Sequence, residues 1–577
     1  MSDADGDPGA DGIQEGKRLI RLGGDKGLSL GERLVERLNR LTWRTPIHAM
    51  RLKGRHPLKL VAVPDDPIPG DAQRGKGLLA GTLFFRGESR QIAMLDLTKP
   101  DFSRAFSDYL HGFSWLRDLS TVATRAAAAP AAEGLMRLWL AAHADTVSEP
   151  AWRVDLWGRR ILFWTAHAPL ILSSTDLVYR SSVLNALARG ARHLERGAEK
   201  APVGAARIAA WCGVIVAGLL IPGGDPRRSL GEAGLLRALG VSISEDGGST
   251  SRSPVVQLDI VMLLSMLRET YTARRMALPD GIERVLSRMV SALLGVSLGD
   301  KALSSWQGGL PISAVTIADI IHASGVRGRP LRQAREWGYQ RLAAGATIAV
   351  IDAAPPPVAR LVEGGCASTL AFEMSDGAQR IIVNCGGARG AVSQLPSELA
   401  EALRTTAAHS TLVVGDSNST AIHADGTLGR GVAEVELNRQ ESDAASRIEA
   451  SHDGYARRYG LVHRRLLALS ADGRDLRGED MLLPQGRRRK AVATTFAIRF
   501  HLAPGIDVAP TADGMAALLR LPGGVLWQFR CRGGTLALED SLWVDGDGRP
   551  HATHQLVVSG EAPAGGASVS WALKRAT

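Results

Sequence analysis

The chain has 577 residues, 45% hydrophobic and 22% charged, a balance typical of soluble globular proteins with a large buried core. Lysine and arginine outnumber aspartate and glutamate by 69 to 59, and the net charge of +10 favours an anionic partner. The basic residues are scattered rather than gathered on a helix with interleaved aromatic residues, which argues against nucleic acid. The 4 cysteines contain no CxxC pair, which excludes a zinc ribbon, a thioredoxin motif and a dense disulfide framework.

The N-terminal stretch MSDADGDPGADGIQEGKR is acidic and glycine-rich and lacks the features of a signal or transit peptide. We expect residues 1–25 to be a disordered tail, followed by a mixed segment over residues 26–98. No apolar run has the length of a membrane span, because WCGVIVAGLLIPGG, which begins at Trp211, is short and stops at Pro222.

Residues 99–342 are predicted to form a helical domain, because apolar residues recur there at helical spacing. The segment VVQLDIVMLLSMLRETY is apolar nearly all round, as expected for an inner, buried helix. Connections are short and rich in Gly, Pro, Asp and Ser, and no solenoid period is visible. The predicted helices cover residues 101–118, 122–144, 155–170, 174–198, 202–220, 228–239, 254–275, 279–295 and 315–324.

Residues 343–577 change to a period of two, which is typical of strands with one buried face. The stretch 370–374 alternates before a DG turn at 376–377, and a second DG turn at 472–473 indicates another hairpin. VLWQFRC, TLALEDSLWV and HQLVVSG continue the pattern toward the C-terminus. Many strands joined by short turns, with no intervening helices, favour a β-sandwich.

His409 stands among small and polar residues at the entrance of a predicted strand, in LRTTAAHSTLVVGDSNST. A buried imidazole needs a hydrogen-bond partner, a metal ion or a substrate. A core histidine bonded to the backbone and a functional histidine are both open at this point.

The segment HDGYARRYGLVHRR brings His452, Tyr455, Arg457 and His463 close together in the sequence. Arginine neutralises a carboxylate and thereby lowers the pKa of the neighbouring carbon, and tyrosine or histidine can then transfer the proton. The combination points to proton abstraction next to a carboxylate. The alternative is an exposed hairpin with stacked side chains.

Two loops of the helical region are candidates for sugar binding. EDGGSTSRSP carries Arg252 and is polar enough to bind hydroxyl groups, and SLGDKALSSWQGGLP carries Trp306, whose ring can stack on a sugar. The structural alternatives are a simple connection for the first loop and a plug between helices for the second. HExxH and Walker sequences are absent, so zincins and P-loop enzymes are unsupported.

The segments LAFEMSDGAQRIIVNCGG, RTTAAHSTLVV and HDGYARRYGLVHRRLLALSADGRDLRGEDML resemble the bacterial heparinase II/III-like family. The resemblance covers residues 345–577 and extends through YLHGFSWLRDL and DGGSTSRSP in the helical region. It implies an incomplete (α/α) toroid followed by a large antiparallel β-sandwich. It also implies cleavage of an acidic, uronate-containing polysaccharide by β-elimination, and export to the cell envelope or periplasm.

The family's metal-supporting positions in the sandwich fall on Cys366, Asn384 and His409, of which only His409 is the residue that the resemblance implies. Cysteine and histidine are good zinc ligands, whereas asparagine is a poor one. We therefore predict no cofactor and keep zinc at these three residues as the alternative.

A polysaccharide lyase built on this pattern would hold an anionic chain between toroid and sandwich. In it, Tyr455 or His452 serves as base and acid, and His409 positions them. The predicted catalytic residues are His409, His452 and Tyr455. The predicted substrate-binding residues are Arg252, Arg457, Tyr179 and Trp306, with the two arginines neutralising the uronate.

Two further hypotheses stay open. The toroid segment SRSPVVQ lacks the tyrosine and histidine that the family carries after the DG loop, which favours a non-catalytic glycan-binding or cell-envelope protein on a lyase scaffold. The lack of a visible signal peptide favours a cytoplasmic protein with an unrelated partner. The sequence indicates an acidic polysaccharide partner and no nucleic acid, and it leaves the oligomeric state open.

Overall fold

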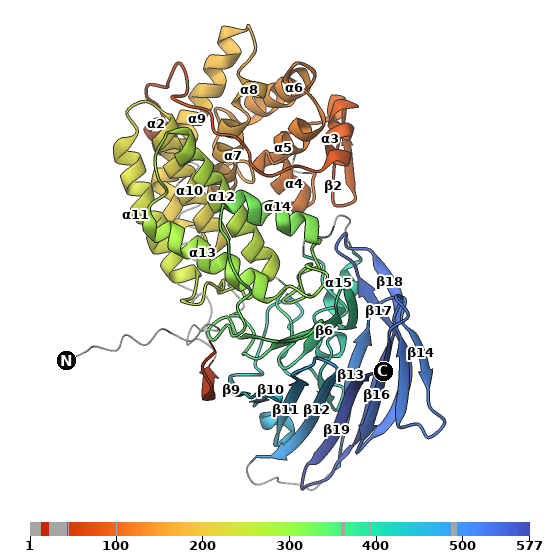
Figure 1. Cartoon of the computed structure of the whole chain (residues 1–577). Helices are drawn as coiled ribbons and strands as arrows, with labels where there is room; N and C mark the ends of the chain where they lie inside the picture. The colour runs from red at the N-terminus through yellow and green to blue at the C-terminus, as the bar shows by residue number, and fades with distance from the viewer. Residues whose placement is uncertain are drawn as a thin grey trace, which may run out of the picture.

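The computed structural model describes residues 13–21, 43, 45–99, 101–358, 364–389, 391, 395–485 and 493–576. A helical domain stands on a sandwich of two antiparallel sheets (Figure 1). The predicted order, an incomplete (α/α) toroid followed by a large antiparallel β-sandwich, is confirmed. Among the helices of the described part, none is both long and apolar enough to cross a bilayer.

The toroid helices lie close to their predicted positions. They are α4 (Arg104–Gly112), α5 (Trp115–Val122), α6 (Arg125–His143), α7 (Val154–Ala166), α8 (Ala168–Ile171), α9 (Leu177–Gly197), η2 (Ala198–Lys200), α10 (Ala205–Leu220), α11 (Asp225–Ser242), α12 (Pro254–Ala273), α13 (Asp280–Gly295) and α14 (Ala314–Ser324). The helix predicted over 101–118 is divided in two, because Phe113 takes a left-handed conformation with φ of 65° and ends α4.

Helix α10 lies at the centre of the toroid, where it packs against α7, α9, α11 and α12. Its residues are apolar and buried nearly all round, as a helix surrounded by other helices requires. Glycines allow the closest approaches: a Cβ atom on Gly158 of α7 would lie 2.1 Å from the Ala209 carbonyl oxygen of α10. The toroid core is therefore close-packed at its centre.

The segment that precedes the toroid contributes to both domains. Its elements on the toroid are α2 (Pro46–Arg51), α3 (Ala72–Leu79), the hairpin of β2 (Thr82–Phe85) and β3 (Glu88–Gln91), and η1 (Ile92–Met94). Strand β1 (Gly16–Arg21) instead pairs with β9 in the sandwich. The predicted disordered tail over residues 1–25 is thus corrected at β1, and its residues 1–12 and 22–25 lie outside the described residues.

The sandwich begins with β4 (Tyr339–Ala344) and β5 (Thr347–Asp352), a few residues before the predicted boundary. Further elements are β6 (Phe372–Asp376), β7 (Gln379–Val383), α15 (Ser397–Ala402), η4 (Thr406–Ala408), β8 (Leu412–Val414), β9 (Glu434–Glu441), β10 (Ala445–His452), α16 (Ala456–Tyr459), β11 (Leu461–Ser470), β12 (Asp475–Pro484), β13 (Thr494–Leu502), β14 (Asp507–Pro510), β15 (Ala516–Arg520), β16 (Leu526–Arg532), β17 (Thr535–Val544), β18 (Pro550–Ala562) and β19 (Ala567–Arg575).

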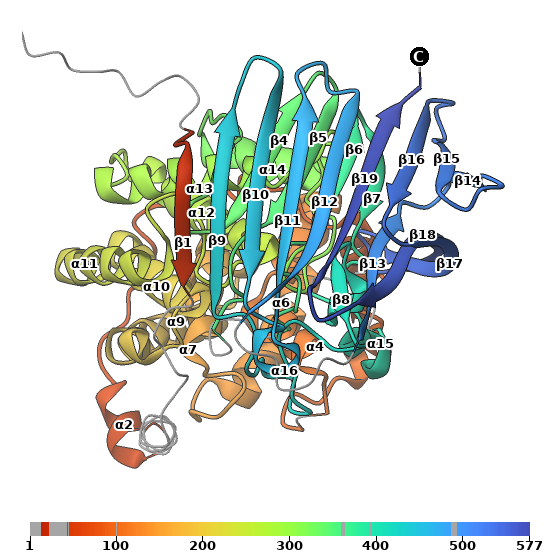
Figure 2. The ribbon, with the colours of Figure 1, turned by 90° about the horizontal axis from the view of Figure 1, so that it is seen from below.

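Within the described residues, one sheet has nine strands in the order β1-β9-β10-β11-β12-β19-β16-β15-β14 (Figure 2). The other runs β17-β18-β13-β7-β6-β5-β4, with β8 paired to β13. The predicted DG turns join β6 to β7 and β11 to β12, and Gly377 and Gly473 supply the positive φ values of 54° and 71° that these turns need. Apolar residues of the two inner faces form the sandwich core.

Candidate functional site

Arg252 lies where the toroid meets the sandwich, just before α12. Its guanidinium donates hydrogen bonds to groups of the sandwich and of the connection that leads to it. It donates to Asp352 Oδ1 at 2.5 Å, to the Trp337 carbonyl at 2.8 Å and to the Pro355 carbonyl at 2.7 Å. Asp352 also accepts from Ser368 Oγ at 2.7 Å and is fully buried. The predicted uronate-binding arginine therefore serves as a buried tie between the domains, and its charge is already balanced.

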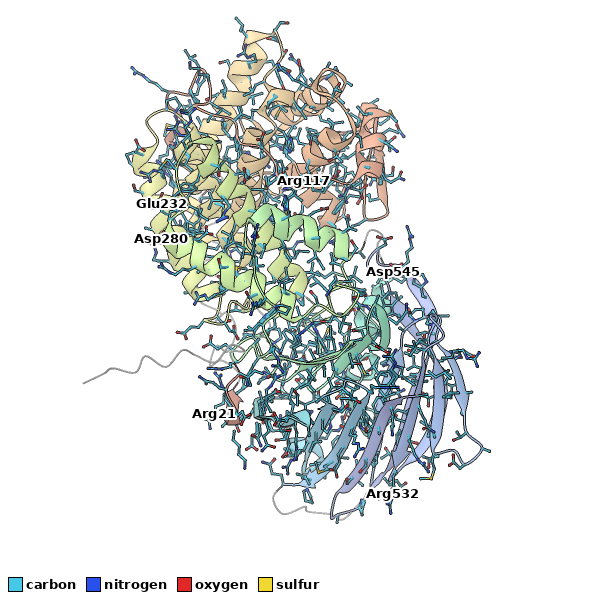
Figure 3. The ribbon with its side chains drawn as sticks, in the orientation of Figure 1. Arg21, Arg117, Glu232, Asp280, Arg532 and Asp545 are labelled. Atoms are coloured by element: carbon cyan, nitrogen blue, oxygen red, sulfur yellow. The ribbon has the colours of Figure 1, made fainter. Side chains whose placement is uncertain are left out.

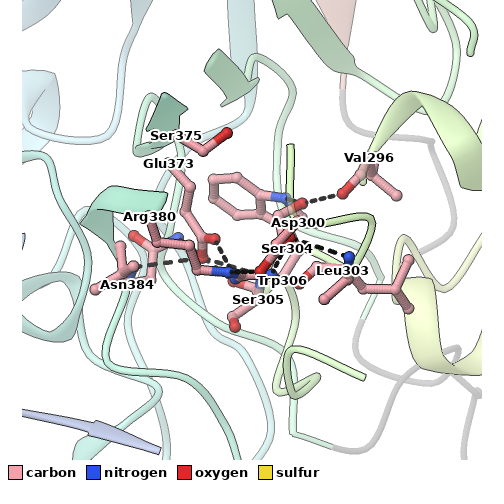
Figure 4. Close-up of polar contacts among 12 residues, drawn as sticks. Val296, Asp300, Leu303, Ser304, Ser305, Trp306, Glu373, Ser375, Arg380 and Asn384 are labelled. Carbon is pink, nitrogen blue, oxygen red and sulfur yellow. Dashed lines mark hydrogen bonds and ion pairs between the residues drawn. The ribbon is translucent and has the colours of Figure 1, made fainter. Parts of the chain in front are cut away.

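Trp306 belongs to a connection between α13 and α14 that packs on β6 and β7 (Figure 4). Its ring is fully buried, its Nε1 donates to Ser304 Oγ at 2.6 Å, and its ring lies 5.5 Å from that of Tyr339. Beside it, Arg380 bonds Asp300 at 2.7 Å and approaches Glu373 at 3.4 Å. The Trp306 ring, which we predicted to stack on a sugar, instead fills the space between the two domains.

The three residues considered for zinc lie near this junction, but their polar atoms have other partners. Asn384 donates to Glu373 Oε1 at 3.1 Å and accepts from the Ser410 amide at 3.0 Å. Burial raises the pKa of the Cys366 thiol to about 11, which disfavours the thiolate that binds metal. Within the described ranges, no group of three or more His, Cys, Asp or Glu side chains is placed to hold a metal ion. The residues present therefore do not fit a zinc site.

His409 is buried at the end of η4, and its Nδ1 lies 2.7 Å from the Thr405 carbonyl, so that nitrogen carries the proton and donates. Burial lowers the pKa of His409 to about 4, so the ring is neutral at physiological pH. The sequence left two alternatives open for His409, a core histidine bonded to the backbone and a functional histidine. Its environment in the structure is that of a core histidine.

His452 and Tyr455 lie inside the sandwich. His452 Nδ1 accepts from the Gly454 amide at 3.1 Å, and its Nε2 lies 3.3 Å from His463 Nδ1. The Tyr455 hydroxyl donates to the Leu412 carbonyl at 2.9 Å, and burial raises the pKa of this phenol. Both side chains are almost fully buried, and His452 is also among the residues that line a depression across β1, β9, β10 and β11.

Arg457 and Tyr179 lie away from these histidines. Arg457 is exposed on the short helix α16. Tyr179 is buried near the start of α9, with the guanidinium of Arg137 4.2 Å from the centre of its ring. The predicted site residues thus occupy the domain junction, the sandwich interior, the sandwich surface and the toroid. Their catalytic and binding roles remain predictions.

A cleft of about 720 Å³ opens in the toroid beside β2, α4 and α14. These three elements lie on the side of the toroid that faces the sandwich (Figure 1). Its charged and phenolic lining residues are Asp71, Arg74, Arg86, Asp108, Tyr109, Arg117, Asp118, Asp155, Arg159, Asp259 and Asp319. The Tyr109 hydroxyl donates to Asp118 at 2.6 Å, and burial together with Asp118 raises the pKa of this phenol.

Most of the positive charge in this cleft is neutralised inside the protein. Arg74 bonds Asp118 at 2.8 Å, Arg159 bonds Asp259 at 2.5 Å, and Arg117, in the toroid interior of Figure 3, bonds Asp66 at 2.8 Å. Arg86, at the tip of the β2–β3 hairpin, forms no such ion pair with a described residue. Burial and the nearby Arg389 of the sandwich lower the pKa of Arg86. The lining therefore offers little excess positive charge.

The sequence contained one signal for this cleft. Tyr109, Arg117 and Asp118 all belong to YLHGFSWLRDL, the toroid segment that carries part of the family resemblance. The segment shows no periodicity beyond that of a helix, so its carboxylate and phenol could not be distinguished from ordinary surface residues.

Comparison with known families supports the resemblance. The sequence profile described as "Heparinase II/III-like, C-terminal" matches residues 326–572. The matched region contains β4 to β18 and most of β19, so it includes almost all of the sandwich.

Solved lyase structures share the fold of nearly the whole chain, including the toroid that precedes the matched region. Heparinase III superposes with a TM-score of 0.68 at 12% identity, covering 96% of this chain and 92% of that one. A mutant of heparan sulfate lyase HepC from Pedobacter heparinus gives 0.61 at 14% identity, covering 94% and 88%. In sequence, the chain is 29% identical to FtsZ-localized protein C of Caulobacter vibrioides (strain NA1000 / CB15N), over 92% of each chain.

Proposed function

We propose that this protein is a non-catalytic member of the heparinase fold, which acts by binding, in association with FtsZ, rather than by cleaving an acidic polysaccharide. The observation that carries the proposal is the burial of the predicted catalytic groups. The Tyr455 hydroxyl, His409 Nδ1 and both His452 nitrogens already contact protein groups. A general base must reach the proton of a bound substrate, and buried groups with internal partners lack that access.

The charge of the toroid cleft supports the same proposal. A cleft that attracts a polyanion needs an excess of positive charge over its own acidic groups. Here Arg74, Arg117 and Arg159 are each paired with an aspartate, and further aspartates line the wall. The pairs stabilise the cleft walls and leave little positive charge for a polymer.

The relative with the higher sequence identity supports the FtsZ part of the proposal. FtsZ-localized protein C is similar along 92% of both chains, at an identity about twice that of the lyases. A shared location at FtsZ would give this protein a role that needs no turnover.

Two measurements on the purified full chain test the proposal. We expect no rise in the ultraviolet absorbance of unsaturated uronate with heparan sulfate, chondroitin sulfate, hyaluronan or alginate, under conditions in which heparinase III gives a signal with heparan sulfate. We expect the chain to sediment with assembled FtsZ and to stay in solution without it. A uronate signal that grows with protein concentration, or no co-sedimentation, would contradict the proposal.

The second candidate is the polysaccharide lyase that the sequence indicated, located in the cell envelope or periplasm. The observation in its favour is the cleft itself, which has room for several sugar rings and carries Tyr109 and Arg86. If this candidate holds, a uronate signal appears and fractionation finds the protein in the periplasm. Loss of that signal in His452→Ala and Tyr455→Phe would assign the chemistry to the sandwich, and loss in Tyr109→Phe would assign it to the cleft.

A further inference from the structure

Strand β1 forms one edge of the nine-stranded sheet, although β9, its partner, belongs to the far end of the chain (Figure 2). The two strands are antiparallel over 6 residues, from Gly16 opposite Arg439 to Arg21 opposite Glu434. Two reciprocal hydrogen bonds, of 2.8 and 3.2 Å, also join Gln14 to Gln333 in the connection between the domains. The N-terminal segment is therefore held at a sheet edge beside that connection.

The side chains of β1 contribute little to holding it there. All are exposed except Ile20, which is half-buried against the sandwich core. Arg21, at the sheet edge in Figure 3, bonds Glu434 at 2.9 Å, but the two side chains are 70% and 47% exposed, and such pairs are weak. A strand with few buried apolar contacts and solvent-exposed backbone hydrogen bonds opens locally at low free energy.

Strand β9 is anchored far more firmly than β1. Its Val435 and Leu437 lie in the sandwich core, and it pairs with β10 along its length. Arg439 is fully buried and donates to the Arg332 carbonyl at 2.7 Å and the Arg341 carbonyl at 3.0 Å. These anchors do not depend on β1, and an edge of β9 without β1 would present unpaired backbone N–H and C=O groups, which are the template for strand addition.

The outer side of this edge is hollowed and acidic. A depression of about 670 Å³ lies across β1, β9, β10 and β11. Directly opposite residues share a face of a sheet, so Leu19 and Arg21 lie beside Glu436 and Glu434. Lys17 and Arg18 also line the depression, and they belong to β1, whereas Glu434 and Glu436 belong to β9. Glu449, on β10, is already paired with Arg447 and Arg464.

We propose that the edge of β9 is a strand-binding site for an extended basic segment of a partner protein, and that β1 occupies this site when the partner is absent. The bound segment adds one antiparallel strand through backbone hydrogen bonds. It places basic side chains over Glu434 and Glu436 and an apolar side chain in the position of Ile20. The charge of the edge gives the preference for a basic segment, and the weak anchoring of β1 makes the exchange accessible.

A labelled peptide tests the proposal in the full chain. The peptide IQEGKRLIRL reproduces residues 13–22, and its binding is followed by fluorescence anisotropy. In the Ile20→Pro variant, proline removes a backbone donor and weakens the pairing of β1. We expect at least tenfold tighter binding to Ile20→Pro than to the wild type, because the wild-type site is filled. Equal affinities for the two proteins would overturn the proposal.

Charge provides the matched controls. A peptide with glutamate in place of its lysine and two arginines should lose at least tenfold in affinity for Ile20→Pro. The added pair Glu434→Lys and Glu436→Lys should have the same effect on the original peptide. Glu479→Lys, on β12 of the same sheet, should leave its affinity unchanged. If Glu479→Lys weakens binding as much as the Glu434→Lys and Glu436→Lys pair and the glutamate peptide do, the peptide does not bind at β9 and the proposal fails.

Two further readouts separate other occupants from the one proposed. Hydrogen exchange of the wild type, with the peptide in excess, should show residues 14–21 losing protection while residues 434–441 keep it. This measurement tests the exchange even if the proline variant does not fold. Light scattering should show no dimer that depends on β1. If the wild type forms a dimer and Ile20→Pro abolishes it, a second copy of this chain occupies the edge of β9, and the proposal is overturned.

Discussion

The carboxylate of Asp480 lies 2.7 Å from Nε of Arg465 inside the sandwich, where the two residues are 1% and 2% exposed. Asp480 also accepts from His463 Nε2 at 2.7 Å and from Trp571 Nε1 at 2.9 Å. Arg465 continues to the carbonyls of Leu370 and Ser410, which precede β6 and β8 of the facing sheet. This pair therefore ties the two sheets together through fully satisfied polar groups.

Replacing Asp480 should be among the most damaging single changes in the sandwich. Asp480→Asn leaves the Arg465 charge buried without a counter-charge, and breaking a buried pair in this way costs about 3–5 kcal/mol. Urea unfolding at neutral pH measures the loss. Asp547→Asn is the control, since Asp547 is exposed and lies 3.6 Å from Arg549, and its change should stay below about 1 kcal/mol. Equal losses in the two variants would contradict the role of the pair.

His409 should make the protein less stable as the pH falls. Its folded pKa, about 4, lies below the usual value of 6.5 because the ring is buried. Between these values the unfolded chain binds a proton that the folded chain does not, so acid favours unfolding. Over this window the stability of the wild type should fall by about 1.4 kcal/mol per pH unit more than that of His409→Asn.

Urea unfolding at several pH values between 6.5 and 4 checks this difference in slope. Identical slopes for His409→Asn and the wild type would show that this imidazole does not resist protonation in the folded protein.

Two helical glycines should respond in opposite directions to alanine. Gly158→Ala places a Cβ atom 2.1 Å from the Ala209 carbonyl oxygen, so α7 and α10 must move apart, at a cost of about 1–3 kcal/mol or more. Gly134 of α6 has open space around the same position, and Gly134→Ala should stabilise by about 0.5–1 kcal/mol. Thermal unfolding of both variants measures the contrast, and a shift of the same sign in both would refute the close helix contact.

The Arg252 guanidinium should not be replaceable by an ammonium group. It bonds Asp352 and the carbonyls of Trp337 and Pro355 at once, which the single nitrogen of lysine cannot do. Arg252→Lys should therefore lose about 2–4 kcal/mol of stability, as expected for hydrogen bonds of a charged group. Arg457→Lys, on the exposed face of α16, should lose almost nothing in the same denaturation experiment. Wild-type stability of Arg252→Lys would show that the junction does not depend on this tie.

Most helices were predictable because their apolar residues recur at helical spacing, and α10 because it is apolar nearly all round. The break at Phe113 escaped the prediction, because a left-handed residue leaves no mark in an amphipathic pattern. Strand β1 escaped it for another reason: GKRLIR has no alternation of apolar residues, and its pairing depends on the backbone of β9. A strand that contributes almost nothing to the core cannot be found from hydrophobic patterning.

The sequence by itself determined the two-domain order, most helix positions, the hairpin turns and the family resemblance, because these follow from periodicity and local motifs. Only the tertiary structure decided what His409, Tyr455 and Arg252 do. Their partners are the carbonyls of Thr405, Leu412 and Trp337. Every residue carries such a carbonyl, so no sequence pattern identifies the carbonyl that a given side chain will contact in the fold. The same histidine or arginine is therefore compatible with a catalytic site and with a buried structural contact, and only the tertiary structure distinguishes the two.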